Sequence, residues 1–204
     1  MDAVRMIYLS GKIPKNTAKL GVMLSYNVGK QRTDGHHVYA VDNGCFANPG
    51  KYTDEGYFQY LSGLNSKQCL FAAAPDVVGN AEKTRQRAYP VLKRIRELGF
   101  KAAYVIQDGE TPDEIRWDEM DAIFIGGSTD WKLGEQARAI VIEAKKRGKW
   151  VHMGRVNSYR RMRYAQAIGC DSVDGTFLAF APDLNEKRMI NWIDRVQQQP
   201  TLEF

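Results

Sequence analysis

Two short segments of the chain hold side chains that could do covalent chemistry. Residues 41–46 and 171–176 each begin as an apolar, strand-like run and pass through an aspartate toward a glycine. One carboxylate can attack an electrophilic carbon while another moves a proton, provided that both face one cleft. We therefore predict that Asp42 and Asp174 act together in one cleft, as a nucleophile and a general acid/base. Asp171 is a rival nucleophile, but it stands at the start of its run. A structural role is the alternative, because aspartate near glycine is typical of a turn.

The elements that must position these carboxylates are strands alternating with helices. Apolar, β-branched runs predict strands at about 4–9, 19–24, 37–42, 69–73, 102–106, 122–126, 149–153 and 170–174. Helical periodicity predicts helices near 54–64, 80–98, 131–147, 158–168 and 185–198. Asn80 is a plausible N-cap, and Gly99, Gly148 and Gly169 are plausible helix stops. This alternation implies right-handed βαβ units and a parallel sheet.

Eight strands favour a compact, closed (β/α)8 TIM-like barrel, formed by residues 1–204 as one domain. The chain is short for this fold, and its first two connections look too short for full helices. We therefore expect some helices to be shortened or missing. An open, doubly wound sheet is the competing architecture. Because the sequence has no apolar run long enough to span a membrane and no evident leader segment, we expect a cytoplasmic protein.

Carboxylates, amides and glycines gather where the predicted strands end. Asp76 follows the fourth strand, Gln107 ends the fifth, and residues 126–127 end the sixth. The seventh strand runs into residues 153–158, which are rich in polar groups. The opposite strand ends are plainer, as at residues 148–150. Because barrel enzymes place their active sites at the carboxyl ends of the strands, this asymmetry predicts an enzyme.

This series resembles the tRNA-guanine transglycosylases, which exchange guanine for a 7-deazaguanine within a polynucleotide. Residues 42–46 resemble that family's Asp-Ser-Gly-Gly-Phe/Tyr segment, and Asp76 resembles its guanine-reading aspartate. Residues 107–109 and 125–127 are similar to its Gln-Gly and Ile-Gly-Gly segments. Residues 171–174 resemble its Asp-Met-Phe-Asp segment, whose second aspartate is the nucleophile. The motifs follow the family's order over most of the chain.

The resemblance implies that Asp174 forms a covalent glycosyl intermediate and that Asp42 exchanges protons with the leaving and entering bases. Asp76 would accept hydrogen bonds from the N1–H and amino groups of guanine, unless it only shapes a turn. The other implied base-binding residues are Gln107, Gly126, Gly127 and Phe46. The alternatives for these are a tight strand exit at the glycines and a core position for the aromatic ring. No cofactor and no metal are expected.

The chain departs from the tRNA enzymes in two ways. It lacks their Cys-x-Cys-x2-Cys…His zinc subdomain, since its cysteines, Cys45, Cys69 and Cys170, lie far apart. It is also much shorter than those enzymes. Both departures remove parts associated with tRNA docking, so the chain looks like the compact bacteriophage relatives linked to 7-deazaguanine in DNA. We therefore expect DNA as the partner rather than tRNA, a 7-deazaguanine base as the small substrate, and host cytoplasm as the setting.

The chain is mildly basic, with a net charge of +5 and a pI near 9.0. This suits a nucleic-acid partner without requiring one. Helix-start amides and arginines after the seventh strand could bind phosphate, and a lysine after the sixth strand could help. The predicted phosphate-binding residues are Lys132, Arg155, Asn157, Ser158, Arg160 and Arg161. The alternative is a solvated basic face. His152 lies within a strand and is expected to be a core histidine.

Three other functions are alternatives. The first is a phosphosugar- or nucleotide-processing barrel, which would need an internal lysine or metal ligands at the mouth; Lys132 is the nearest lysine, and the sequence shows no evident set of carboxylate and histidine ligands. The second is a DNA glycosylase that removes a base without replacing it. The third is a nucleic-acid binder without catalysis, which the presence of both Asp42 and Asp174 argues against.

Overall fold

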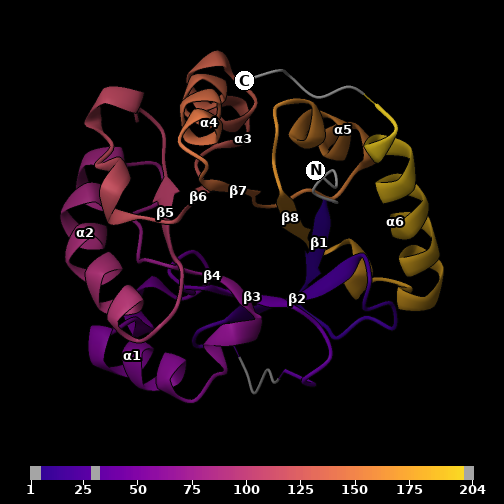
Figure 1. The fold of residues 1–204 in the computed structure, drawn as a ribbon, viewed down its shortest axis with the longest axis horizontal. Coiled ribbons are helices and arrows are strands. Elements are labelled where there is room, and N and C mark those ends of the chain that lie inside the picture. Colours follow the sequence, from indigo (N-terminus) through magenta and orange to yellow (C-terminus); the bar gives the residue numbers. More distant parts are fainter. Residues whose placement is uncertain (1–5, 29–32, 200–204) are drawn as a thin grey trace.

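The computed structural model describes residues 6–28 and 33–199. Eight parallel strands close into a barrel, each pairing with the next and β8 pairing with β1 (Figure 1). The strands are β1 (Ile7–Ser10), β2 (Leu20–Ser25), β3 (Tyr39–Asp42), β4 (Cys69–Ala73), β5 (Ala102–Ile106), β6 (Ala122–Ile125), β7 (Trp150–Met153) and β8 (Ser172–Gly175). The predicted closed barrel is confirmed and the open sheet is wrong. Residues 4 and 5, predicted to begin the first strand, lie outside the described residues.

The described residues form six α-helices around the barrel, fewer than a full (β/α)8 fold would have (Figure 1). They are α1 (Asp54–Ser62), α2 (Ala81–Glu97), α3 (Thr129–Lys132), α4 (Glu135–Lys146), α5 (Tyr159–Ala167) and α6 (Pro182–Gln197). Among the described residues, no α-helix follows β1, β2 or β5; the β5 connection holds only the short 3₁₀ turns η3 (Pro112–Glu114) and η4 (Trp117–Glu119). The structure is therefore a reduced TIM-like barrel.

The predicted helix over 131–147 is wrong in one respect, because it is two helices. Leu133 ends α3, and Gly134 takes an extended conformation as the N-cap of α4. The predicted N-cap at Asn80 is confirmed, since its side chain accepts a hydrogen bond from the Lys83 N–H. These helix starts set the direction in which each mouth loop leaves its strand.

Alternation along the strands divides the buried side chains between two layers. Larger groups such as Tyr8, Tyr39 and Tyr104 pack between the barrel and the helices. The barrel interior is filled mainly by smaller groups, together with Phe71 and Phe124. The interior is thus a packed core, and only the side chains at the carboxyl ends of the strands can reach a ligand.

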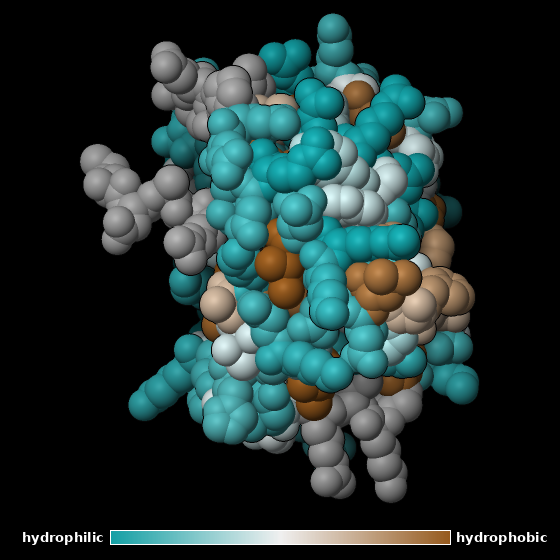
Figure 2. Space-filling model, turned by 90° about the vertical axis from the view of Figure 1, so that its right-hand side faces the viewer, coloured by the Kyte–Doolittle hydropathy of each residue, from teal (hydrophilic) through white to brown (hydrophobic). Residues whose placement is uncertain are grey.

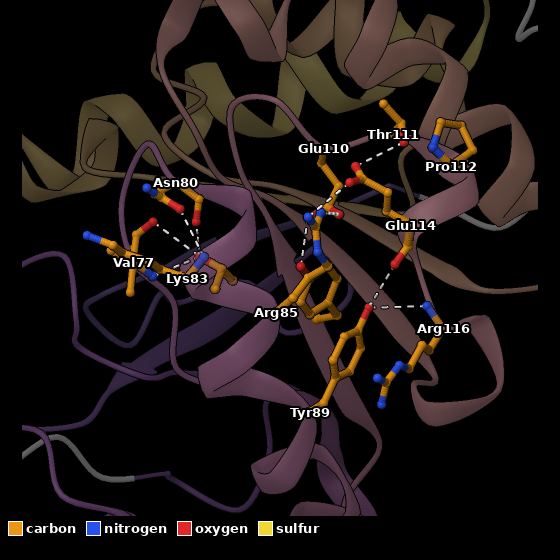
Figure 3. Close-up of polar contacts among 12 residues, drawn as sticks. Val77, Asn80, Lys83, Arg85, Tyr89, Glu110, Thr111, Pro112, Glu114 and Arg116 are labelled. Carbon is orange, nitrogen blue, oxygen red and sulfur yellow. Dashed lines mark hydrogen bonds and ion pairs between the residues drawn. The ribbon is translucent and has the colours of Figure 1, made fainter.

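A polar network takes the place of the missing helix after β5 (Figure 3). Arg85 on α2 contacts Glu110 at 2.6 Å and Glu114 at 3.0 Å. The Tyr104 hydroxyl donates to Glu110 over 2.7 Å, and the Arg116 N–H donates to the Tyr89 hydroxyl. These contacts fix the loop that leaves β5, and this loop begins at Gln107.

Arg85→Ala is expected to destabilise the fold by about 3–5 kcal/mol, because it leaves the fully buried Glu110 carboxylate without its cation. Burial raises the pKa of Glu110, so protonation at low pH should reduce the loss. Arg94→Ala, which breaks an exposed pair with Glu97, is the control and should cost less than about 1 kcal/mol. Urea unfolding at two pH values measures both variants. Equal losses for the two arginines would contradict the structural role of the network.

The outer face that α6 covers is mostly hydrophilic, with hydrophobic residues scattered over it (Figure 2). Within the described part of the chain, no helix is long and apolar enough to cross a membrane.

Candidate active site

A pocket of about 520 Å³, including the space open to solvent at its mouth, lies at the carboxyl ends of the strands. Loops from β3 through β8 contribute to its wall. Most of the residues predicted from the sequence line it: Asp42, Phe46, Asp76, Gln107, Gly126, Gly127, Lys132, Arg155 and Asp174. The structure therefore brings together both predicted catalytic carboxylates, all the predicted base-binding residues and two of the predicted cations.

Asp42 ends β3 and is only partly exposed. Its Oδ1 accepts a hydrogen bond of 2.6 Å from the Gly44 N–H. Gly44 has φ +76°, and a Cβ there would collide with the backbone oxygen of Tyr26, so glycine is required at this turn. Burial raises the pKa of Asp42 to about 7, and the negative charges of Asp174 and Asp76 add to the effect. A carboxyl group with this pKa can both donate and accept a proton near neutrality.

Asp76 is almost fully buried, and two amide side chains hold its carboxylate. Asn43 donates to Oδ1 over 2.9 Å, and Gln107 donates to Oδ2 over 2.6 Å. The side-chain amide oxygen of Gln107, Oε1, in turn accepts hydrogen bonds from the Gly79 and Gly127 N–H groups. Burial raises the pKa of Asp76, while the amide donors oppose the rise. Loops from three strands thus fix the orientation of this carboxylate.

Asp174 lies on β8, level with the pocket floor. Its Oδ1 accepts a short hydrogen bond of 2.6 Å from the Arg155 N–H, and its Oδ2 lies 3.6 Å from the His152 Nε2. Asp171, the rival nucleophile, is at the other end of the strand, where it pairs with Lys145 at 2.8 Å. Asp171 also accepts from the Val151 N–H. Of the two aspartates, only Asp174 lines the pocket.

Two cations border the pocket on the side opposite Asp42. Lys132 is 3% exposed, and its Nζ donates to the Gly154 carbonyl oxygen over 2.9 Å. Burial, together with the charge of nearby Arg155, lowers the pKa of Lys132 to about 8. Arg155 has φ +62°, and its guanidinium binds the Gly127 carbonyl oxygen and lies 5.1 Å from the centre of the Phe46 ring. It therefore spans part of the mouth.

The other predicted phosphate-binding residues do not line the pocket. Asn157 accepts from the Thr176 and Phe177 N–H groups, which ties the β7 loop to the β8 loop. Ser158 caps α5, and Arg161 donates to the Arg155 carbonyl oxygen. Arg160 lines a separate groove on the outside of α5. A phosphate role for these four residues remains a prediction.

Two polar residues of the site were missed as functional residues. Asn43 was noted only within its motif, although its side chain helps to hold Asp76. His152 was assigned to the core, and it is fully buried, but its Nε2 faces Asp174. Alternation along β7 could have indicated the position of His152, because it places His152 and Gly154 on the same, inward face of the strand.

Two exposed hydrophobic side chains, those of Phe46 and Val78, line the pocket. The other large hydrophobic residues that the described chain exposes are Ile13, Leu133, Phe180 and Leu184. Phe46 is 62% exposed, so its ring is available for stacking rather than buried in the core, which was the alternative. An exposed aromatic ring of this kind can contact planar or apolar groups that approach the pocket.

The cysteines contribute no nucleophile to the pocket as it stands. All three are free and buried in the described chain. Burial raises the pKa of Cys45, the one nearest the mouth, to about 11, which leaves it a neutral wall residue near pH 7. Among the described residues, no group of three or more His, Cys, Asp or Glu side chains could hold a metal ion.

Comparison with known proteins shows the fold and not the family. No family model matches the chain, and no curated protein is significantly similar in sequence. A native KDPGal structure is similar over 98% of this chain and 98% of its own, with a TM-score of 0.59 and 11% identity. A flavocytochrome b2 variant is similar over 89% of this chain and 56% of its own, with a TM-score of 0.56 and 9% identity. These similarities show that the chain shares the TIM-barrel fold.

Proposed function

We propose that the protein is a transglycosylase that replaces guanine in DNA with a 7-deazaguanine, such as 7-cyano-7-deazaguanine. One observation carries the proposal: three aspartates line a single pocket in three different settings. Asp174 accepts a hydrogen bond from the Arg155 N–H, Asp42 has a pKa of about 7, and Asp76 is held by two amide side chains. These settings match a nucleophile, an acid/base and a base-reading group.

The exchange would run in two balanced steps. Asp174 attacks the sugar C1′, the bond from C1′ to guanine N9 breaks, and the departing base receives the proton of Asp42. In the second step the N9–H of the incoming deazaguanine returns a proton to Asp42 while N9 attacks C1′. The ester bond to Asp174 then breaks, and both carboxyl groups are restored. A carboxyl group that titrates near neutrality can serve both directions.

Asp76 is the group best placed to identify the base. Its two oxygens accept from amides along the pocket wall, and they retain lone pairs for the N1–H and amino groups of guanine. The Gln107 side chain links this carboxylate to the Gly127 N–H, so the base-reading wall acts as one unit. Adenine presents an acceptor at N1 and would meet this carboxylate unfavourably.

DNA rather than tRNA is the polynucleotide in this proposal, and competition between the two substrates tests the choice. The target guanine must leave its stack to reach a pocket at the mouth of a barrel, as in other enzymes that act on bases. Mismatched or single-stranded DNA should therefore react faster than intact duplex. The exposed Phe46 ring and the neighbouring Arg155 could support the displaced base.

A second candidate function rests on Lys132. Its amine is buried, lines the pocket and has a pKa of about 8, and such an amine can attack a carbonyl to form an imine. The protein would then process a phosphorylated sugar, with Arg155 as a phosphate ligand. Borohydride reduction in the presence of phosphorylated aldehydes or ketones would leave a mass adduct on Lys132 if this function is correct.

The deciding experiment measures base exchange directly. The protein is incubated with matched DNA and tRNA that carry labelled guanine, with and without 7-cyano-7-deazaguanine, and the nucleosides are analysed by mass spectrometry. Release of label with appearance of the deazaguanine nucleoside in DNA supports the proposal. Abasic sites without insertion would indicate a glycosylase, and faster insertion into tRNA would overturn the choice of DNA. Activity should also survive excess chelator, because two carboxylates supply the chemistry.

Asp76→Asn is expected to reduce the preference for guanine roughly 10- to 100-fold, because the amide presents a donor to the base's donor edge. DNA affinity should change little, since phosphates rather than the base dominate affinity. Competition between guanine- and hypoxanthine-containing substrates measures the preference, and filter binding measures the affinity. Val78→Ala, at the same loop but without a polar group, is the control. A parallel loss of affinity and preference would contradict the base-reading role.

DNA binding should weaken steeply with salt, and Arg155→Gln should reduce the slope of log K against log salt by roughly one. The same test on Arg160→Gln and Arg161→Gln shows whether the outer arginines also contact phosphate. Arg94→Gln removes an equal charge near the opposite end of the barrel and serves as the control. If the variants at 155, 160 and 161 all keep the parental slope, these arginines form only a solvated face.

A further inference from the structure

A fully buried histidine lies directly beneath Asp174 inside the barrel. His152 is on β7, and its ring packs against Phe71 and Phe124, with ring centres 5.0 and 4.5 Å away. Its Nε2 has no hydrogen-bond partner and lies 3.6 Å from Oδ2 of Asp174. Burying an imidazole nitrogen without a hydrogen-bond partner costs free energy, so the position of Nε2 beside the Asp174 carboxylate needs an explanation.

The hydrogen bonds on the far side of the ring are compatible with one tautomer in particular. The Trp150 indole N–H donates to the Ser172 Oγ over 2.9 Å. With that lone pair occupied, the Ser172 hydroxyl can direct its own hydrogen to His152 Nδ1, which lies 2.9 Å away. Nδ1 is then the acceptor, and the hydrogen of the neutral imidazole is on Nε2, facing Asp174.

We propose that His152 is a positioning residue that holds the Asp174 carboxylate, with Trp150 and Ser172 fixing its tautomer. This proposal rests on the function proposed above, in which Asp174 is the nucleophile. The carboxylate then lies between the Arg155 backbone N–H, 2.6 Å away on the mouth side, and the His152 Nε2–H, 3.6 Å away on the barrel side. Both groups limit its rotation, as covalent attack requires.

The surroundings explain why a neutral donor suits this place. Phe71 on β4 and Phe124 on β6 cover the faces of the imidazole, and Ser172 on β8 covers Nδ1, so Asp174 is the one charged group in contact with it among the described residues. The other titratable or charged groups near Asp174 are Asp42, Tyr8, Lys132 and Arg155. The His152 Nε2–H, on the barrel side of Asp174, counters the repulsion between the carboxylates of Asp174 and Asp42 without placing a cation in the apolar core.

The kinetic test compares His152→Leu with His152→Gln. Leucine removes the donor and should lower the rate constant of single-turnover adduct formation roughly 10- to 100-fold with the KM for DNA unchanged. Glutamine can place an amide N–H at the Nε2 position and should restore most of this rate. Phe71→Leu is the matched control, because it alters packing around the same ring without touching the donor, and its rate should be close to the parental one. A parental rate in His152→Leu, or no rescue by glutamine, would overturn the proposal.

A second measurement is independent of activity, and its first part uses the parental protein alone. Nitrogen-15 NMR of the histidine rings of the parental protein should show the Nε2-protonated tautomer for His152. Ser172→Ala should release that preference, and Asp174→Asn should shift the Nε2 resonance. A proton on Nδ1, or an Nε2 resonance indifferent to Asp174→Asn, would refute the positioning role even if base exchange is confirmed. If base exchange is absent while the NMR result holds, the contact stands and the proposed function fails.

Discussion

Replacing Asp174 with asparagine is expected to abolish base exchange, with a loss of about four orders of magnitude or more. The amide keeps the size of the side chain and can still accept the hydrogen bond from the Arg155 N–H, so the pocket should survive. It cannot form the ester bond to C1′. Denaturing gels of the parental protein with DNA should show a covalent adduct, and the same gels should lack it for Asp174→Asn and Asp174→Ala.

Asp171→Asn is the matched control on the same segment of the chain. Its carboxylate supports Lys145 and the Val151 N–H at the far end of the barrel, so its loss should lower stability and leave the adduct intact. Normal turnover by Asp174→Asn would show that the nucleophile lies elsewhere. Adduct loss in both variants would point to a general effect on folding, which thermal unfolding of each protein would reveal.

The strands could be predicted because each is a short apolar run whose length and flanking residues leave few other structures. The same patterns predicted which side chains reach the mouth, since a residue at a strand end such as Asp42 or Asp174 points inward by alternation. The break at Gly134 escaped prediction because the helical periodicity continues across it. Helix boundaries of this kind depend on how the chain packs rather than on local preference.

The polar residues around the pocket were harder to interpret than its carboxylates. Arginines 155, 160 and 161 look alike in the sequence, yet Arg155 reaches the pocket and Arg160 points to another groove. The difference comes from the direction in which α5 leaves β7, which no short motif encodes. The sequence predicts Asn157 as a phosphate ligand but does not show that its amide oxygen accepts from two backbone N–H groups of a neighbouring loop. These hydrogen bonds join the loop after β7 to the loop after β8, so they follow from the fold and not from the sequence of either loop alone.

Asp42 should impose opposite pH dependences on the two halves of the reaction, each with an apparent pKa of about 7. Release of guanine needs the protonated carboxyl group, so single-turnover adduct formation should fall as pH rises through 7. Attack by the incoming base needs the carboxylate, so breakdown of the adduct should rise through the same range. Asp42→Asn should slow both steps by roughly 10²- to 10⁴-fold and remove both dependences. Rapid-quench assays of each half-reaction between pH 5.5 and 8.5 measure the effect, and parallel slopes in both halves would exclude this role.

The same carboxyl group should make the folded protein less stable as pH rises. Unfolded, Asp42 has its ordinary pKa of 3.8, whereas burial raises the folded value to about 7. Between these values the folded state keeps a proton that the unfolded state releases, so the free energy of unfolding should fall from about pH 4 to about pH 7 and then level off. Asparagine carries no charge and can still accept from the Gly44 N–H, so Asp42→Asn should be more stable than the parent by about 1–4 kcal/mol at pH 8 and by nearly nothing at pH 4. Urea unfolding at both pH values tests this. A variant that loses activity while gaining stability only at high pH would identify Asp42 as a strained functional group, whereas equal stability at pH 8 would mean that its carboxylate is well solvated and titrates as an ordinary aspartate.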